Sequence, residues 1–169
     1  MYFFKNSVGA QCIFYFAYGH NTNTKEMLKR VPTDSLVGTA MLADHKLVFH
    51  RFAGVEKESG SQVHGVLWRV SKAGEVVLDE CEGLGVDYKK TKKIVRSGDR
   101  SLPVYTYEQL LKTEKPTSCQ YVAWLKRGYL ENGLPLKQLK TALNVARKAR
   151  RARTTLKRST PRKYCSLRW

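Results

Sequence analysis

Residues 12–18, with the sequence CIFYFAY, constrain the fold of this chain more than any other segment. Apolar and aromatic residues follow one another here without a charged or strongly polar interruption, and the run ends at Gly19. A run of this length that ends at a glycine is typical of a buried β-strand and is too short for a buried helix. The chain therefore has to supply further strands that pair with this one.

Five more segments have the composition and alternation of strands. They are residues 36–42, 45–53, 63–70, 88–96 and 102–108. Between the second and third of these, the polar sequence GVEKESGSQ at 54–62 predicts a loop. The sequence SGDRS predicts a turn between the last two.

Residues 71–83 predict a short helix that precedes the last two strands. Ser71 is suited to begin it, and Gly83 is suited to end it. Val77, Leu78 and Cys81 lie at i, i+1 and i+4, so we expect them to face the core.

Other helix signals lie near the first strand and in the last third of the chain. Asn23 or Thr24 can cap a short helix after the first strand. Ser118 can cap a helix over 119–131, and Pro135 suits the first turn of the next one. The leucines that keep helical spacing after it are Leu136, Leu139 and Leu143.

The order of these elements predicts an α+β fold. It has about six strands, a helix inserted before the last two strands, and helices at the end. A length of 169 residues predicts one domain with an appendage. A domain of this size buries roughly 70% of its unfolded surface, so its core needs no disulfide or metal.

The charge is unevenly distributed, with 31 Lys and Arg against 14 Asp and Glu, a net charge of +17. Residues 145–169 hold ten of the basic residues and no acid, which leaves a net charge of +7 for residues 1–144. We therefore divide the chain into a domain at 1–144 and a basic helical tail at 145–169. The tail is either a solvated, partly disordered extension or a contact for nucleic acid or another polyanion. Its only aromatic residues are Tyr164 and Trp169, which favours nonspecific contact over base stacking.

The cysteines and the N-terminus indicate a cytoplasmic protein. Cys12, Cys81, Cys119 and Cys165 match no zinc or redox spacing, and we expect free thiols. The sequence MYFFKNSVGAQC is too short and too interrupted for a secretory signal. No run reaches the roughly 20 apolar residues of a membrane span.

Two local features carry a chemical signal. In Tyr18-Gly19-His20-Asn21, glycine allows a tight turn whose backbone N–H groups can hold a carboxylate or an oxyanion, although a plain strand-ending turn has the same sequence pattern. In LDECEG, Glu82 closes a helix, where the negative end of the helix dipole raises the pKa of a carboxylate. The alternative is that Glu82 belongs to an exposed acidic face with Glu75 and Asp79. No metal-ligand cluster, serine nucleophile elbow, P-loop or dinucleotide fingerprint is found in the sequence.

Three segments together resemble the γ-glutamylcyclotransferase family. FAYGHN is similar to the family's FAYGSN loop, HGVLWRVSKAGEVVLDECEGLGVDYKK to its GVxW…LDxxEG…Y stretch, and ENGLPL to its C-terminal helix pair. The resemblance runs from about residue 12 to 144 in one order with similar gaps. It implies a small mixed β-barrel with packed helices.

The resemblance also implies a cofactor-free and metal-free reaction. The α-amine of a γ-glutamyl group attacks its own side-chain carbonyl and releases 5-oxoproline and a free amine or amino acid. The family's catalytic glutamate falls on Glu82, and its active-site tyrosine on Tyr88. The substrate-binding residues fall on Tyr18, Gly19, His20 and Asn21.

One residue departs from the family pattern, since His20 stands where serine is usual. A histidine can narrow the pocket, contact a substrate carboxylate or disable the usual binding mode. The alternatives are therefore a cyclotransferase-like protein that has lost turnover and binds a small ligand or a polyanion, and an enzyme whose γ-glutamyl group is carried by a larger molecule.

Overall fold

The structure is a computed structural model that describes residues 13–110, 112 and 115–159. The strands are β1 (Ile13–Ala17), β2 (Ser35–His50), β3 (Phe52–Val70), β4 (Tyr88–Ser97) and β5 (Arg100–Gln109). The helices are α1 (Thr24–Arg30), α2 (Lys72–Cys81), α3 (Cys119–Glu131) and α4 (Leu136–Ser159), and the 3-10 helix η1 covers His20–Thr22. The expected α+β class is confirmed.

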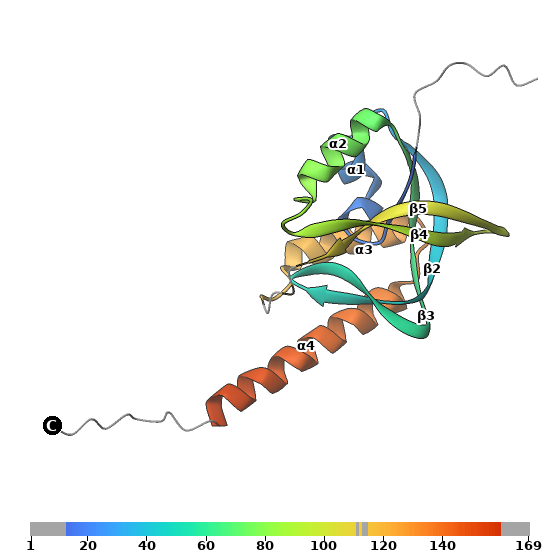
Figure 1. The fold of residues 1–169 in the computed structure, drawn as a ribbon. Helices are drawn as coiled ribbons and strands as arrows, with labels where there is room; N and C mark the ends of the chain where they lie inside the picture. The colour runs from blue at the N-terminus through green and yellow to red at the C-terminus, as the bar shows by residue number, and fades with distance from the viewer. Residues whose placement is uncertain (1–12, 111, 113–114, 160–169) are drawn as a thin grey trace, which may run out of the picture.

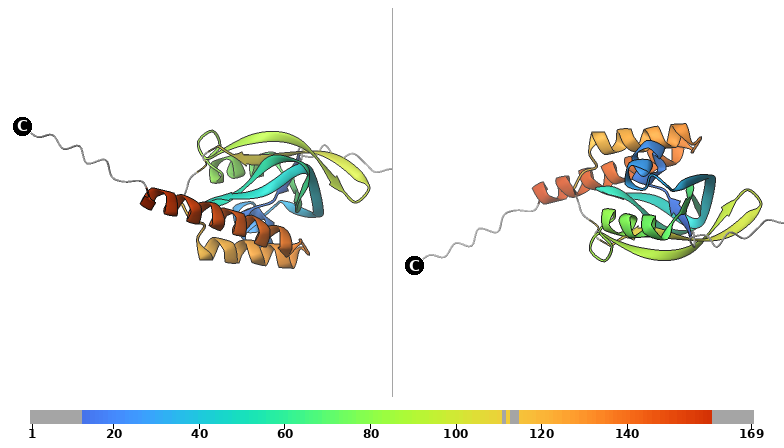
Figure 2. Two further views of the ribbon diagram at one scale, coloured as in Figure 1. Left: turned by 90° about the horizontal axis from the view of Figure 1, so that it is seen from below. Right: turned by 90° about the horizontal axis from the view of Figure 1, so that it is seen from above.

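The strands close into a barrel in the order β1-β3-β2-β4-β5 (Figure 1). Each neighbouring pair is antiparallel except β1 and β5, which are parallel and meet at Tyr15 and Tyr105. In Figure 2, α3 and α4 lie beside each other along one flank of the barrel, and α2 lies on the side of β4 and β5. The expected mixed barrel with packed helices is therefore present.

The barrel has five strands in the described residues, and the expected number of about six was wrong. The two segments 36–42 and 45–53 belong mostly to one strand, β2, which continues through a register shift at Asp44 (φ 53°). The reversal comes later, at Arg51 (φ 78°). Residues 54–62 were expected to form a loop but are part of β3. They are polar because most of them are exposed to solvent on the hairpin, so their polarity did not indicate a loop.

The expected helix signals are confirmed at several termini. Asn23, Ser71 and Ser118 are the N-cap residues of α1, α2 and α3. Each side chain accepts a hydrogen bond from the backbone N–H three residues further on. Gly133 follows α3 with a φ of 63°, and Pro135 directly precedes α4.

Helix α2 packs through a narrower face than its sequence suggested. Leu78 is fully buried, but Val77 is 37% exposed and Cys81 is also exposed, so two of the three expected core residues were wrong. The buried face consists of Leu78 and Gly74, one turn apart. A Cβ at Gly74 would lie 2.5 Å from a carboxylate oxygen of Asp34, so this close approach requires glycine.

The most deeply buried part of the barrel lies where β1 pairs with β3. Phe16, Leu67 and Trp68 are fully buried there. A Cβ at Gly65 would lie 2.4 Å from the carbonyl oxygen of Ala17, so the two strands can approach this closely only at a glycine.

Helix α4 packs on the barrel only through its first half. Leu139 and Leu143 are buried, whereas residues 147–155 are exposed on every side. This second half extends away from the barrel (Figure 1). The helix runs without interruption across the expected boundary between residues 144 and 145. No helix in the described part of the chain is long and apolar enough to span a membrane.

Two of the four cysteines are described, and both Cys81 and Cys119 are exposed free thiols. Cys12 and Cys165 lie outside the described residues, as do the N-terminal segment 1–12 and the end of the basic tail at 160–169.

Candidate active site

A cavity of about 240 Å³ lies beyond the end of β1, between the C-terminal end of α2 and the N-terminal half of α3. Every site residue expected from the sequence lines it. These residues are Tyr18, Gly19, His20, Asn21, Glu82 and Tyr88. The fold therefore brings the glycine turn and the helix-terminal glutamate to one place, although Asn21 and Glu82 are 61 positions apart in the chain.

The glycine turn is anchored on both sides. Thr22 donates to the carbonyl of Gly19 through its backbone N–H over 3.0 Å and through its hydroxyl over 2.8 Å. The indole N–H of Trp68 donates to the carbonyl of Asn21 over 3.0 Å. These bonds fix η1 against β3, so the turn presents its backbone to the cavity in one conformation.

Glu82 is the C-cap residue of α2, and its side chain turns into the cavity with only 15% exposure. Its Oε1 accepts one hydrogen bond from Asn21 Nδ2 and another from Arg30 Nη1, each over 3.0 Å. Gly83 follows with a φ of 60°, which lets the chain leave the helix directly behind the carboxylate. Within the described residues, Oε2 accepts no hydrogen bond from the protein.

Burial raises the pKa of Glu82, while the nearby Arg30 and the hydrogen bonds from Asn21 and Arg30 act in the opposite direction. The effect of burial on this pKa is larger than that of the ion pair, so the pKa of Glu82 lies above its ordinary value. The alternative that Glu82 shares an exposed acidic face is wrong, because Glu75 and Asp79 instead form ion pairs with Lys90, over 2.9 and 2.6 Å. Glu82 is thus separated from the other two carboxylates.

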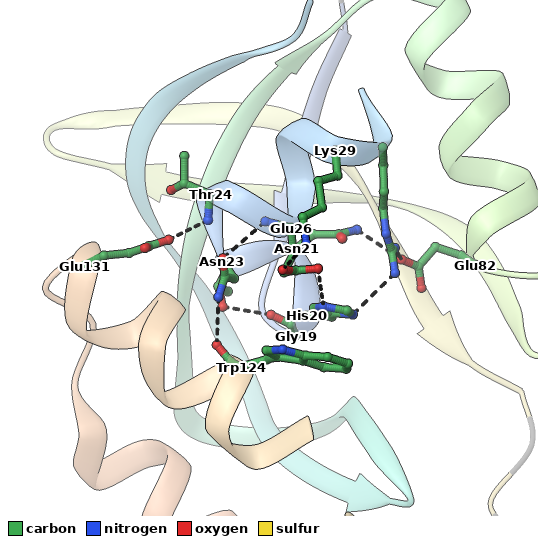
Figure 3. A network of polar contacts seen from close by, with 12 residues as sticks. Gly19, His20, Asn21, Asn23, Thr24, Glu26, Lys29, Glu82, Trp124 and Glu131 are labelled. Carbon is green, nitrogen blue, oxygen red and sulfur yellow. Dashed lines mark hydrogen bonds and ion pairs between the residues drawn. The ribbon is translucent and has the colours of Figure 1, made fainter. Parts of the chain in front are cut away.

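His20 lies flat against Trp124, with ring centroids 4.9 Å apart and the planes 5° from parallel (Figure 3). Its Nδ1 lies 3.3 Å from Arg30 Nη2, and its Nε2 lies 3.9 Å from a carboxylate oxygen of Glu26. Burial, followed by the charge of Arg30, lowers the pKa of His20. The imidazole is therefore neutral near pH 7, and its Nδ1 can accept a hydrogen bond from Arg30. Arg30 thus connects His20 to Glu82.

Tyrosines make up much of the remaining wall, and three of them are hydrogen-bonded to the backbone of neighbouring strands. Tyr18 donates its hydroxyl to the carbonyl of Tyr107, and Tyr88 donates to the carbonyl of Ala53 over 3.4 Å. The hydroxyl oxygen of Tyr121 accepts the backbone N–H of Ala53 over 3.2 Å. Burial raises the pKa of all three tyrosines, so they act as neutral hydrogen-bonding groups.

A sequence model of the gamma-glutamyl cyclotransferase, AIG2-like family matches residues 15–126, which is more than half of the chain. The chain belongs to this family. The match includes the glycine turn, Glu82 and Tyr88, and the resemblance expected from the sequence is confirmed.

Curated relatives and a solved structure agree with this assignment. A mouse protein named gamma-glutamylcyclotransferase is 32% identical over 139 residues, which cover 74% of each chain. The human protein of the same name is 29% identical over 140 residues, covering 75% of this chain and 74% of its own. A solved structure of a gamma-glutamyl cyclotransferase has a TM-score of 0.71 at 27% identity, over 78% of this chain and 86% of its own.

In this member of the family, sequence reasoning missed Arg30, Tyr121 and Trp124, which also line the cavity. Arg30 ends α1 as a basic residue in the last turn, a pattern that a helix dipole explains equally well. Tyr121 and Trp124 lie three residues apart on α3, a spacing typical of any buried helix face. Among the described residues, no three His, Cys, Asp or Glu side chains are grouped to hold a metal ion.

Proposed function

We propose that this family member is a γ-glutamylcyclotransferase that converts γ-glutamyl amino acids or amines into 5-oxoproline and a free amine. The α-amine nitrogen attacks the side-chain carbonyl carbon of the same γ-glutamyl group. A new C–N bond closes the ring, and the bond from that carbon to the leaving nitrogen breaks. The attacking ammonium loses two protons and the leaving nitrogen gains two, so the reaction needs no oxidant or co-reactant.

The observation that carries this proposal is the buried carboxylate of Glu82 with one oxygen fixed and the other free. The substrate ammonium has to lose a proton before it attacks, and Glu82 Oε2 is available to receive it. Burial raises the pKa of Glu82 toward the range in which a carboxylate exchanges protons near neutral pH. The same group can then return the proton to the leaving nitrogen.

Arg30 and Asn21 act in this proposal as positioning residues. Both donate to Oε1, so this oxygen is held in place, while Oε2 accepts no hydrogen bond from the described residues. Arg30 also limits how far burial raises the pKa of Glu82, and so keeps a useful fraction of the base ionised.

The tetrahedral oxyanion requires hydrogen-bond donors that are in place before the reaction. The backbone of the Tyr18–Asn21 turn lines the cavity and is held rigid by Thr22 and Trp68. Tyr121 already accepts the N–H of Ala53, so its own O–H is available to donate to a ligand. In this proposal, Tyr88 and His20 shape the rest of the substrate site.

The size of the cavity favours a small substrate. About 240 Å³ is below the roughly 300–1,000 Å³ of sites for drug-sized ligands. A γ-glutamyl group that is folded back on itself is compact, and holding it so contributes the proximity effect.

The test is release of 5-oxoproline from a panel that includes γ-glutamyl-alanine, γ-glutamyl-ε-lysine and a γ-glutamyl polyamine. We expect Glu82→Gln to lower kcat by about 10²–10⁴-fold, the usual contribution of general acid–base catalysis. Glu80→Gln is the matched control, because Glu80 is exposed on the same helix and outside the cavity. Its rate should equal that of the wild type.

Two outcomes contradict the proposal in different ways. Product formed by Glu82→Gln at the wild-type rate removes Glu82 as the base. No product from any substrate, together with saturable binding of an intact γ-glutamyl dipeptide by calorimetry, favours a binding protein that has lost turnover.

A further inference from the structure

Helix α4 has an unusual charge distribution that the active site does not use. It contains nine Lys and Arg residues and no Asp or Glu. Among the residues of α4 whose side chains are described, none lines the cavity beside Glu82. The charge therefore has to be explained separately from the proposed activity.

Several basic residues of α4 lie on one face of the helix, which begins with Lys137 and Lys140 near its N-terminus. At about 100° per residue, five of those before residue 156 fall within a sector of roughly 100° whose middle lies opposite the buried Ala142, with Arg147 at the edge nearest the buried Leu143. They are Lys137, Lys140, Arg147, Lys148 and Arg151, here called the outer basic face, and all five are exposed. The face extends for about 21 Å along the helix.

The outer basic face has no compensating charge among the described residues. None of the ion pairs in that part of the chain includes one of its five members. Like charges at i, i+3 and i, i+4, such as Arg147 with Arg151, cost roughly 0.2–0.5 kcal/mol each. The helix keeps a repulsive arrangement that an anionic partner would relieve.

We propose that the outer basic face of α4 is a docking surface for double-stranded DNA, which it contacts through phosphates without reading the sequence. A duplex carries one negative charge per about 1.7 Å of its axis, so it offers phosphates along the full length of the face. The exposed second half of α4 extends from the barrel, and a helix about 10–12 Å wide fits the roughly 12 Å major groove.

Other anionic partners fit this helix less well. Between the cations, the outer face presents Thr141, Asn144 and Thr155, so it lacks the apolar side that inserts into a membrane. Helix α4 contains no aromatic residue on which the bases of a single strand would stack. The major groove of an RNA duplex is too narrow for side chains to read, which disfavours insertion of a helix.

The test is fluorescence anisotropy of full-length protein with a labelled 25-base-pair DNA duplex at several salt concentrations. The variant changes Lys140, Arg147, Lys148 and Arg151 to Gln, which keeps helix propensity and size. The matched control changes Lys57, Lys92, Arg96 and Arg100 to Gln. These four residues are exposed on strands of the barrel. Each variant loses four positive charges, so both proteins have the same net charge.

We expect the slope of log K against log salt to become shallower by about 0.9 for each phosphate that the α4 variant no longer neutralises. If two phosphates are no longer neutralised and the two proteins bind equally at 1 M salt, binding of the α4 variant at 0.1 M salt is weaker by roughly 60-fold. The control should keep the wild-type slope, and circular dichroism should show equal helix content in all three proteins.

Several outcomes overturn the proposal. An equal decrease in affinity in both variants would show that net charge alone is responsible. Wild-type affinity in the α4 variant would leave the helix as a solvated extension. Tighter binding to an RNA duplex, to vesicles with 30% phosphatidylserine or to poly-glutamate, again abolished only in the α4 variant, would assign the face to that partner instead. Activity on a γ-glutamyl dipeptide should be unchanged in both variants, which separates this test from that of the proposed function.

Discussion

The change Arg30→Gln tests how the charge state of Glu82 is set. In the structure, Arg30 lies 3.0 Å from Glu82, and the two side chains are 23% and 15% exposed. Burial raises the pKa of Glu82, and Arg30 is the largest opposing influence. Without Arg30 the burial effect is less opposed, so the pKa of Glu82 rises further and the base becomes ionised only at higher pH.

The size of the effect follows from the geometry. An opposite charge within about 4–6 Å usually changes the pKa of a carboxyl group by 1–3 units. We therefore expect the acidic limb of kcat/KM against pH to move upward by at least about one pH unit. Below that limb, each unit lowers the rate tenfold, since the rate follows the ionised fraction.

The assay is 5-oxoproline release from pH 5 to 9, for wild type, Arg30→Gln and Arg30→Lys. Lysine keeps the charge but not the planar fork that reaches both Glu82 and His20, so its limb should stay near that of the wild type while its plateau falls. Titration of the Glu82 carboxyl carbon by ¹³C NMR measures the same change in pKa without requiring turnover.

An identical carboxyl titration of Glu82 in Arg30→Gln and wild type would contradict this role of Arg30. A rate that Arg30→Gln lowers by the same factor at every pH would contradict it as well. That result would mean that Arg30 only supports the local structure and leaves the pKa of Glu82 unaffected.

Three further predictions concern stability. Tyr121→Phe leaves the N–H of Ala53 without its acceptor, and should lower the free energy of unfolding by about 1–3 kcal/mol in urea titration, whereas an unchanged midpoint contradicts the bond. Gly65→Ala places a Cβ 2.4 Å from the carbonyl oxygen of Ala17, and should cost roughly 1–3 kcal/mol or more, seen as a lower Tm. The pKa of His20 is lowered in the folded state, so the unfolded chain binds more protons below about pH 6.5, the ordinary value, and stability falls as pH decreases through that range. This dependence should weaken in His20→Ser, and an identical pH dependence in both proteins would contradict it.

The strands were predictable where one face is buried and less so where neither is. Residues 12–18 and 63–70 have apolar patterns, and both lie largely in strands. Residues 54–62 are also in a strand, but most of them are solvent-exposed, so nothing in their hydrophobic pattern distinguished strand from loop. The polar part of a hairpin is stabilised by hydrogen bonds to the partner strand. The sequence of one segment alone does not indicate that pairing.

The candidate site likewise contains residues that a local sequence pattern reveals and residues that it does not. The glycine turn at Tyr18–Asn21 and the glutamate before Gly83 are local features, and both could be proposed as site residues from short sequence patterns. Arg30 could not, because its role depends on where α1 ends relative to α2. A basic residue in the last turn of a helix is common, and the local sequence does not distinguish a dipole partner from a catalytic neighbour.

The positions of Arg30 and Glu82 at two helix ends account for the electrostatics of the site. Arg30 is the last residue of α1, and Glu82 caps α2, so the negative ends of both helix dipoles lie close to the carboxylate. Burial of Glu82 disfavours its charged form, while Arg30 and Asn21 favour it. A helix C-terminus disfavours a nearby negative charge in the same sense as burial does. In the proposed reaction these opposing influences suit a base that accepts a proton and returns it, because burial without Arg30 and Asn21 would raise the pKa of Glu82 further. The charge of Arg30 and its planar geometry therefore make separate contributions. Arg30→Gln should move the acidic limb of the pH profile, whereas Arg30→Lys should keep the limb and lower the plateau.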